Sequence, residues 1–407
     1  MPETAAQEAA EQGVSGVALD DRFATARRIA DALIYEGYVL YPYRASSGKN
    51  QLRWQFGVLV PPGYCAVDPS ERSTMRTECV VEAGSAARVD VRVRFLRVHE
   101  RRVQRMEGVA FRPVPELQVG DASWSNWDEA EEHQVDLPGL AVDELVEAPA
   151  VAAVALEGRS WEEQLRDPGG SLVGRLLRRE APLRASVRLS AEWAAGPYPL
   201  AKLTLEVSND TDWAPPTGPL GPARGTSGPG GPGSTGGETR AEAVRHSLVA
   251  VHSLLAVTDG HFVSLVDPPE FARPLVTSCS SSWTYPVLAG SPGRDDVVLS
   301  SPIILSDHPE VAPESHGDLF DGTEIDEILS LRVLTLTDGE KMEARGTDPR
   351  AAEIIDRCDN LPPEIWDRLH GAVRMLRPLA DDAPRGSSGS GRLAGSVGSG
   401  AGPEGGG

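Results

Sequence analysis

The residues with the most potential for chemistry lie in an acidic stretch from Asp295 to Leu331. It contains ten Asp or Glu residues, two His residues and no Lys or Arg. Carboxylate oxygens and imidazole nitrogens suit a divalent metal such as nickel or zinc, and the candidate ligands are His308, His316 and Asp318. Their spacing matches neither an EF-hand loop nor an HExxH helix. The alternative is an acidic surface that docks against a basic face, because runs of charge are usually solvated.

A basic cluster lies upstream of this stretch. Its members are Arg88, Arg92, Arg94, Arg97, Arg101, Arg102 and Arg105. A guanidinium group forks onto carboxylate or phosphate, so the cluster could bind anions or an acidic partner. The alternative, which we favour, is a solvated strand face whose arginines pair with the chain's own excess carboxylates.

Other polar residues indicate a site less strongly. His246, His252 and His261 could serve metal or acid–base chemistry, but six residues of a strand span ~20 Å, so we expect separate histidines. Trp124 and Trp127 are either interface anchors or side chains buried in the core. The four cysteines form no CxxC pair, and the motifs of nucleophilic enzymes and phosphate-binding loops are absent. We therefore predict no catalytic residue and no cofactor, with a divalent metal as the alternative.

Composition restricts the class of partner. The chain has 60 Asp and Glu against 39 Lys and Arg, and its formal net charge is −21. This charge argues against nucleic acid or an anionic membrane as a partner. The start of the sequence lacks a basic and apolar leader, and no run of about 18 apolar residues occurs. We expect a soluble, cytoplasmic protein without a membrane span.

Segments rich in Gly and Pro divide the chain. The insert 215–237 and the tail 383–407 have too few apolar residues to offset the entropy cost of ordering them. We predict that both are disordered, together with residues 1–19. Residues 20–382 are predicted to form one mainly β domain, because strands of similar pattern flank the insert.

Periodicity predicts the elements of this domain. Apolar residues at helical spacing predict a helix over 20–36. Two-residue alternation predicts strands, with one face wet, over 51–61, 87–104, 183–195, 200–210, 245–265 and 295–305. Capping signals predict short helices over 348–358 and 362–376, whereas Gly339 and Gly346 weaken a helix between them. The predicted fold is a mainly β, antiparallel β-sandwich-like assembly with an N-terminal helix and short C-terminal helices.

Two segments are distinctive beyond their periodicity: residues 35–64, YEGYVLYPYRASSGKNQLRWQFGVLVPPGY, and residues 320–371, which begin FDGTEIDEILSLRVLTLTDGEKMEARGTDP. Together they resemble an uncharacterised actinobacterial protein family associated with NiFe-hydrogenase gene clusters. The resemblance implies an accessory or assembly role, with a hydrogenase subunit or maturation factor as protein partner, and it implies no catalytic residue. The positions it singles out for partner binding or a structural network are Tyr41, Arg44, Lys49, Asn50, Arg53, Asp321, Glu324, Asp326, Glu327 and Arg332.

The first of these segments contains a basic loop. Arg44 and Lys49 lie on it, and recognition residues are often found on loops. Alternation in the following strand predicts that Trp54 faces the core and Arg53 faces solvent. We expect the loop to pair with the carboxylates of residues 324–327. The favoured function is a non-catalytic accessory protein that acts by protein–protein binding, and the alternative is a metal-handling or hydrolytic protein that uses the segment 307–327.

Overall fold

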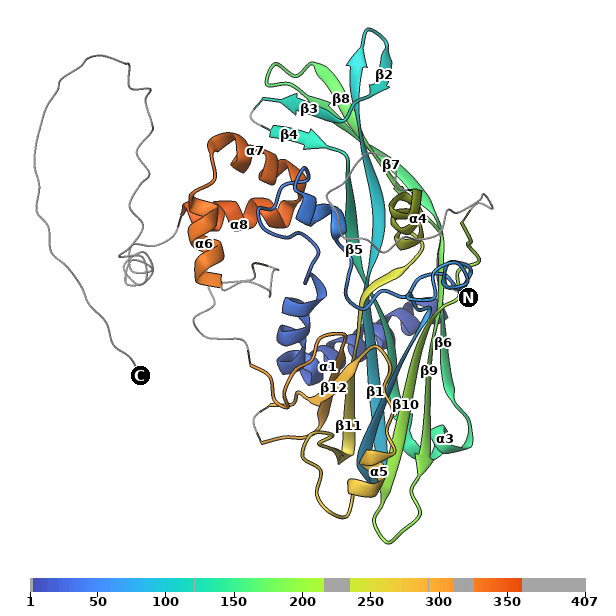
Figure 1. Ribbon diagram of the computed structural model, residues 1–407. Coiled ribbons are helices and arrows are strands. Elements are labelled where there is room, and N and C mark those ends of the chain that lie inside the picture. The colour runs from blue at the N-terminus through green and yellow to red at the C-terminus, as the bar shows by residue number, and fades with distance from the viewer. Residues whose placement is uncertain are drawn as a thin grey trace, which may run out of the picture. The chain divides into compact units, whose positions relative to one another are not determined.

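One long strand, β1 (Thr74–Glu107), organises the computed structural model (Figure 1). The structure describes residues 3–120, 122–215, 235–291, 293–310, 319 and 326–360. The helices are α1 (Glu3–Ile34), η1 (Gly48–Leu52), α2 (Pro62–Cys65), α3 (Val142–Glu147), α4 (Thr235–Val244), α5 (Arg273–Thr277), α6 (Asp326–Leu334), α7 (Asp338–Thr347) and α8 (Pro349–Asp359). The further strands are β2 (Ala110–Pro113), β3 (Glu116–Val119), β4 (Ala122–Ser125), β5 (Trp127–Ala141), β6 (Ala150–Leu156), β7 (Arg159–Arg166), β8 (Leu172–Glu180), β9 (Leu183–Trp193), β10 (Leu200–Asn209), β11 (Leu248–Val263), β12 (Tyr285–Leu288) and β13 (Val297–Ser301).

Strand β1 exchanges its partners along its length. Its first residues pair with β10, its middle pairs with β11 on one side and β5 on the other, and its end pairs with β8 and β2. All these pairings are antiparallel, and the main path of the sheet runs β12-β13-β11-β1-β10-β9-β6. The adjacent β9 and β10 form the hairpin that alternation predicted.

The inner face of the sheet forms the main hydrophobic core. Val89, Val91, Val93 and Phe95 of β1 are fully buried and cluster with apolar side chains of β9, β10 and β11. The sheet therefore bends until β9 and β10 face the middle of β1, and alternating side chains fill the space between them. This arrangement confirms the predicted class, a mainly β antiparallel assembly with an N-terminal helix and short C-terminal helices.

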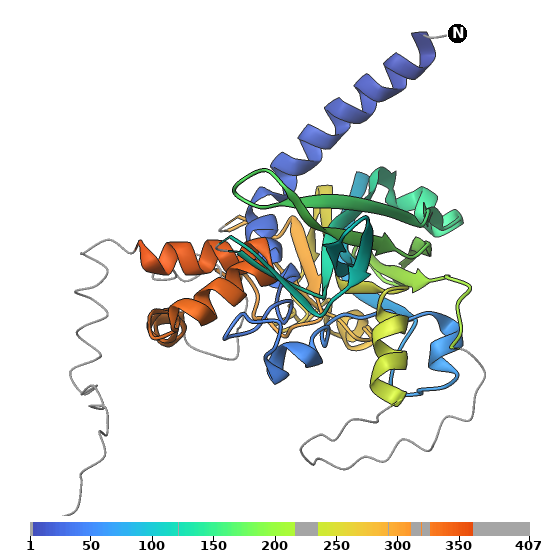
Figure 2. The same ribbon diagram turned by 90° about the horizontal axis from the view of Figure 1, so that it is seen from above.

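Helix α1 packs near the opposite face of β1, and Figure 2 shows its C-terminal part against the sheet. Arg92 donates to both carboxylate oxygens of Asp136, at 2.7 and 2.9 Å. Arg94 pairs with Asp31 of α1 at 2.6 Å and with Glu132 of β5 at 3.0 Å. Both arginines are buried, so the prediction of a solvated face is wrong for them: the helix excludes water, and carboxylates replace it.

The predicted strand over 51–61 is also wrong. Its first residues belong to the short helix η1. The remainder forms one isolated bridge with β11, between Leu59 and Leu248, and the carbonyls of Phe56 and Gly57 accept from Ala250 and Val251 of the same strand. Trp54 has a φ of 64°, in the left-handed region that a strand does not visit. Alternation therefore fails here, and Arg53 and Trp54 are both buried.

The C-terminal helices follow their capping residues. The Asp348 carboxylate accepts from the Arg350 backbone N–H at 2.9 Å, and a proline opens α8, as predicted. Helix α7 forms despite Gly339 and Gly346, because Thr337 and Glu340 make a capping box at its start. The predicted helix over 362–376 lies outside the described residues.

The predicted boundaries differ from the structure at two points. Helix α1 starts at Glu3, so it includes most of the segment 1–19 that we expected to be disordered. Helix α4 starts at Thr235, inside the predicted insert, whereas residues 216–234 and the tail 383–407 lie outside the described residues. None of the helices formed by the described residues combines the length and apolar character needed to cross a membrane.

Substituting alanine for either of two glycines in α7 is expected to change the stability of the protein in opposite directions. A Cβ at Gly346 would lie 1.6 Å from the carbonyl oxygen of Ser123 in β4, whereas a Cβ at Gly339 would contact nothing within 4 Å. We expect Gly346→Ala to lower the free energy of unfolding by about 3 kcal/mol through overpacking. The matched control Gly339→Ala should raise it by about 0.5 kcal/mol through helix propensity. Urea unfolding measures both, and equal effects would contradict the packing of α7 on β4.

His252 of β11 predicts a loss of stability in mild acid. It is fully buried beside Arg94, and burial first and the guanidinium second lower the pKa of its imidazole to about 4. The unfolded chain takes up this proton near pH 6.5, so stability is complete above that pH and falls as the pH drops towards 4. The full effect is about 3 kcal/mol. Urea unfolding at pH 7 and pH 5 should show that His252→Gln loses less free energy of unfolding between the two pH values than the wild type does. An equal loss in both proteins would show that another group causes the effect.

Candidate functional site: an arginine-lined pocket

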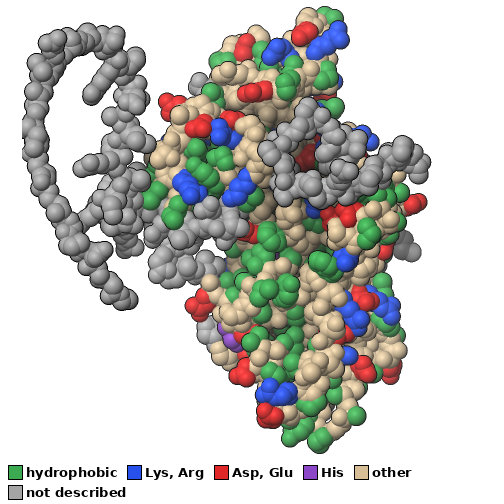
Figure 3. Space-filling model, in the orientation of Figure 1, with side chains coloured by type: hydrophobic (Ala, Val, Ile, Leu, Met, Phe, Trp, Pro, Cys, Tyr) green, Lys and Arg blue, Asp and Glu red, His purple; other side chains and the backbone are tan. Residues whose placement is uncertain are grey.

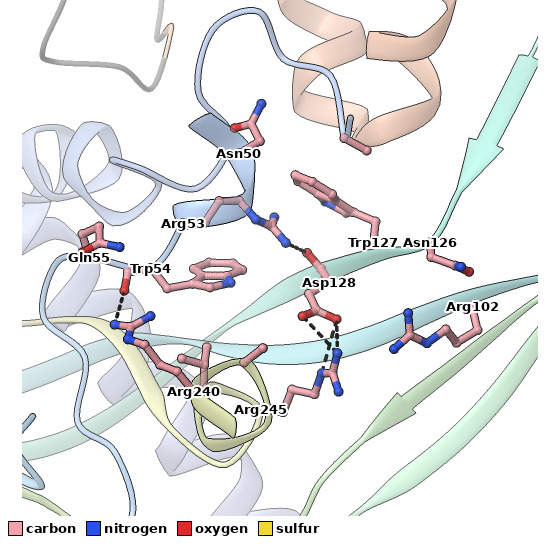
Figure 4. Close-up of a pocket in the computed structure, with 13 residues that line it drawn as sticks. Asn50, Arg53, Trp54, Gln55, Arg102, Asn126, Trp127, Asp128, Arg240 and Arg245 are labelled. Carbon is pink, nitrogen blue, oxygen red and sulfur yellow. Dashed lines mark hydrogen bonds and ion pairs between the residues drawn. The ribbon is translucent and has the colours of Figure 1, made fainter. Parts of the chain in front are cut away.

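A pocket of about 360 Å³ opens between the loop that follows α1, the start of β5 and helix α4 (Figure 4). We call it the arginine pocket. Its lining residues are Ala45, Asn50, Arg53, Trp54, Gln55, Arg102, Asn126, Trp127, Asp128, Arg240, Ala241, Val244 and Arg245. Four arginines and one carboxylate contribute to this wall, so charged hydrogen-bond donors predominate.

Arg53 is fixed at one wall of the pocket by aromatic rings and carbonyl groups. Its guanidinium carbon lies 3.4 Å from the ring centroid of Trp127 and 4.7 Å from that of Trp54. The group donates to the backbone carbonyls of Tyr38 at 3.3 Å and Asp128 at 2.8 Å. No carboxylate in the described part of the chain lies within 4 Å of it, and burial lowers the pKa of Arg53 to about 10. Carbonyl dipoles and π-faces make the direct contacts to its positive charge, and the carboxylates of Asp128 and Asp348 stabilise the charge from a greater distance.

Arg245 holds the one carboxylate of the pocket. Its Nε and Nη2 donate to Oδ1 of Asp128 at 3.3 and 3.1 Å, and its Nη1 lies 2.8 Å from Glu242 and 3.2 Å from Glu100. Burial alone would lower the pKa of Arg245, but the three carboxylates outweigh burial and raise it. Asp128 is therefore held as an ion-pair partner, which orients Arg245 rather than leaving a free base.

Arg240 and Arg102 retain unused donors. Arg240 directs Nε to Glu71 at 2.6 Å and Nη2 to the carbonyl of Trp54 at 3.0 Å. Arg102 pairs through Nη2 with Glu100 at 2.5 Å and is half exposed. Within the described residues, Nη1 of Arg240 and both Nε and Nη1 of Arg102 have no partner. Figure 4 shows Arg102 reaching towards Arg245, whereas Arg240 points from α4 towards the carbonyl of Trp54. All three side chains line the same pocket, so these donors are available to a ligand.

The lining of the pocket is dominated by hydrogen-bond donors. Its lining, as far as the structure describes it, contains no Ser, Cys, His, Lys or Tyr that could act as a nucleophile or proton shuttle. Trp127 adds an indole N–H that is buried and has no acceptor among the described residues. An excess of charged donors over the single carboxylate suits an anion.

The structure assigns separate roles to the predicted residues of the first segment. Asn50 is buried, and its amide bonds both backbone groups of Leu40, at 2.6 and 2.7 Å, which closes the loop. Arg53 is in the pocket and not solvent-facing. Tyr41 is half-buried near α6, and Lys49 is exposed on η1.

The second segment contacts the first, as the ion-pair hypothesis required, but through other carboxylates. Arg44 lies 3.1 Å from Glu340 and 3.9 Å from Glu343, both on α7. Arg332 of α6 lies over the ring of Tyr41. The side chains of Asp326 and Glu327, and the whole of Asp321 and Glu324, lie outside the described residues.

The structure shows no metal-site geometry in its described part. No group of three His, Cys, Asp or Glu side chains there could hold an ion. His308 lies 3.2 Å from Asp295 and is partly exposed. The other proposed ligands, His316 and Asp318, lie outside the described residues. His246 precedes β11 and stacks on Trp213, away from His252 in the strand.

Two of the four arginines that line the pocket could not be predicted from the sequence. Arg240 and Arg245 follow the Gly- and Pro-rich insert, and nothing in their local pattern connects them with residues near position 53. The sequence leaves Trp127 either an interface anchor or a core side chain, and the structure shows it buried under Arg53. The useful signal was the pair of tryptophans in a polar context, which also contains Asp128.

The sequence matches no known protein-family model and no curated protein.

A buried tyrosine joins the two predicted segments. The Tyr38 hydroxyl donates to Asp348, the cap of α8, at 2.6 Å and accepts from the backbone N–H of Ala130 in β5 at 3.2 Å. Burial and the adjacent carboxylate raise the pKa of Tyr38 well above its usual range. One hydroxyl therefore fixes α8 and β5 to the loop that carries Arg53.

Removing this hydroxyl tests its structural role. We expect Tyr38→Phe to lower the free energy of unfolding by about 2 kcal/mol, because it leaves a buried N–H unpaired and a buried carboxylate with one donor fewer. The matched control is Tyr41→Phe, whose hydroxyl makes a long 3.5 Å contact with the carbonyl of Arg332. It should cost at most about 0.5 kcal/mol. Urea unfolding compares the two, and equal losses would refute the assigned role of Tyr38.

Proposed function

We propose that the protein is a non-catalytic accessory protein that binds a carboxylate-bearing segment of a partner protein in the arginine pocket. The observation that carries this proposal is the set of unused guanidinium donors of Arg102 and Arg240, which line the same pocket as Arg53 and Arg245. Arginine forks match carboxylate geometry. The absence of a nucleophile from the described lining supports binding without turnover.

The overall charge favours an acidic protein segment over nucleic acid. A net charge of −21 repels a polyanion at long range. A short acidic segment carries few charges and can enter a local basic site, where the low dielectric strengthens each ion pair. Glu71, Glu100 and Glu242 neutralise part of the site from behind, so the pocket is selective for a small anionic group.

The identity of the partner rests on the resemblance of residues 35–64 and 320–371. It supports a hydrogenase subunit or maturation factor in the cytoplasm as the protein that supplies the acidic segment. Asn50, Arg53 and Trp54 belong to the first of these segments and line the pocket. The segment that carries the resemblance and the segment that forms the proposed site therefore overlap.

Charge reversal at Arg102 tests the proposal. The probe is an acetylated, amidated triglutamate peptide, titrated calorimetrically at low ionic strength. We expect Arg102→Glu to weaken binding at least tenfold, because it removes two available donors and places a like charge at the pocket. The matched control is Arg105→Glu, also an exposed arginine of β1 but absent from the pocket lining, which should retain wild-type affinity.

The outcomes separate the alternatives. Equal weakening by both variants would indicate a non-specific charge effect and would refute the pocket as the site. Binding of inorganic phosphate in preference to the peptide would refute a protein segment as the ligand. Capture from the organism that encodes the chain, with the two variants in parallel, should recover hydrogenase components with wild type and Arg105→Glu but not with Arg102→Glu.

A further inference from the structure

A second cavity adjoins the arginine pocket. We call it the aromatic groove; its volume is about 330 Å³, and its walls include the exposed side chains of Arg72, Trp283 and Tyr285 and the half-buried side chains of Phe56 and Pro302. Gln55 and Arg240 line both cavities, so the groove continues from the pocket across the Arg240 side chain. Figure 3 shows hydrophobic side chains at the surface of the molecule over the region of β11 and β12.

The groove is an unusual place for large aromatic side chains. Trp283 is 53% exposed and Tyr285 is 45% exposed, and they are two of the five exposed aromatic side chains in the described part of the chain. Trp283 has a φ of 65°, a conformation that costs a bulky residue energy. The guanidinium carbon of Arg72 lies 4.9 Å from its ring centroid and holds one face of it. The fold therefore keeps an indole at the surface in a strained conformation.

We infer that the aromatic groove binds an apolar side chain of the same acidic segment whose carboxylate enters the arginine pocket. This inference rests on the proposed function and specifies its ligand: an extended peptide with one or more acidic residues close to a leucine or an aromatic residue. Continuity across Arg240 requires the two anchors to lie on one short stretch of chain. Arg72 beside Trp283 extends the positive charge along this stretch, which again favours an acidic peptide over a neutral one.

The groove also gives the interaction its specificity. A carboxylate alone is a common group, and exposed ion pairs contribute little free energy. An apolar side chain that leaves water for an aromatic wall adds affinity in proportion to its buried area. A partner must then present both groups at one spacing, which random acidic surfaces rarely do.

A peptide series tests the inference. The reference is the acetylated and amidated triglutamate peptide, and the series adds one leucine before or after the glutamates at spacings of one to four residues. We expect at least one spacing to bind about tenfold more tightly than the reference, as partial burial of a leucine side chain predicts. Trp283→Ala and Tyr285→Ser should each reduce this gain without changing the affinity for triglutamate. The matched control Tyr198→Ala alters another exposed aromatic residue and should keep the gain.

The result distinguishes the two levels of the proposal. If triglutamate binds and Arg102→Glu weakens it, but no leucine peptide gains affinity, the groove is not part of the site and the inference is wrong. A gain that persists in both Trp283→Ala and Tyr285→Ser refutes it as well. If triglutamate itself does not bind, the proposed function fails. Circular dichroism of each variant establishes that it is folded before titration.

Discussion

The structure depends on the neutralisation of arginines that β1 carries into the interior. Arg92, Arg94, Arg97 and Arg101 lie on one strand and are all nearly inaccessible to solvent. A buried charge is tolerated only when it is paired and fully hydrogen-bonded. Arg92 and Arg94 pair with carboxylates of α1 and β5. Arg97 pairs with Glu180 of β8. Arg101 pairs with Glu129 of β5 and donates to the last two backbone carbonyls of α7. Each pairing fixes one element against β1, so the charges of a single strand specify how the surrounding helices and strands pack.

The arginine pocket is a partial exception to this rule. The same strand continues to Arg102, where a guanidinium emerges from the packed region and keeps free donors. Arg53 lines the same pocket and is buried, and its direct contacts are carbonyls and aromatic rings rather than a carboxylate. The buried arginines of β1 each pair with a carboxylate, although Nη1 of Arg94 and Nε of Arg97 have no hydrogen-bond partner among the described residues. Arg102 differs because it is half exposed and its remaining donors are accessible to a ligand. A ligand carboxylate at the opening would complete the pattern that carboxylates of the chain complete elsewhere.

Sequence patterns predicted the sheet well because alternation is a local property. The inner residues of β1 and the β9–β10 hairpin follow from period two alone, and the cap at Asp348 follows from three consecutive residues. The burial of the outer face of β1 could not be predicted from the sequence. A strand whose polar residues are covered by a helix shows the same alternation as a strand whose polar residues face water. The predicted strand over residues 51–61 was wrong for another reason. The left-handed backbone conformation of Trp54 depends on tertiary contacts, and it turns Arg53 towards the interior instead of towards solvent. The pocket combines segments almost two hundred residues apart, a juxtaposition that one sequence does not encode locally.

The arginine pocket and the aromatic groove each have a neighbouring residue that weakens their attraction for other molecules. Donors that were entirely free would bind any anion in solution, and an apolar groove without charge would promote association with other hydrophobic surfaces. Here Glu71 holds Arg240 from behind while Arg72 covers one face of Trp283. Each anchor is therefore weakened by a neighbour of the same chain. Under the proposed function, a ligand that engages both anchors at once would bind more tightly than one that engages either alone, so weak separate anchors would be a source of discrimination.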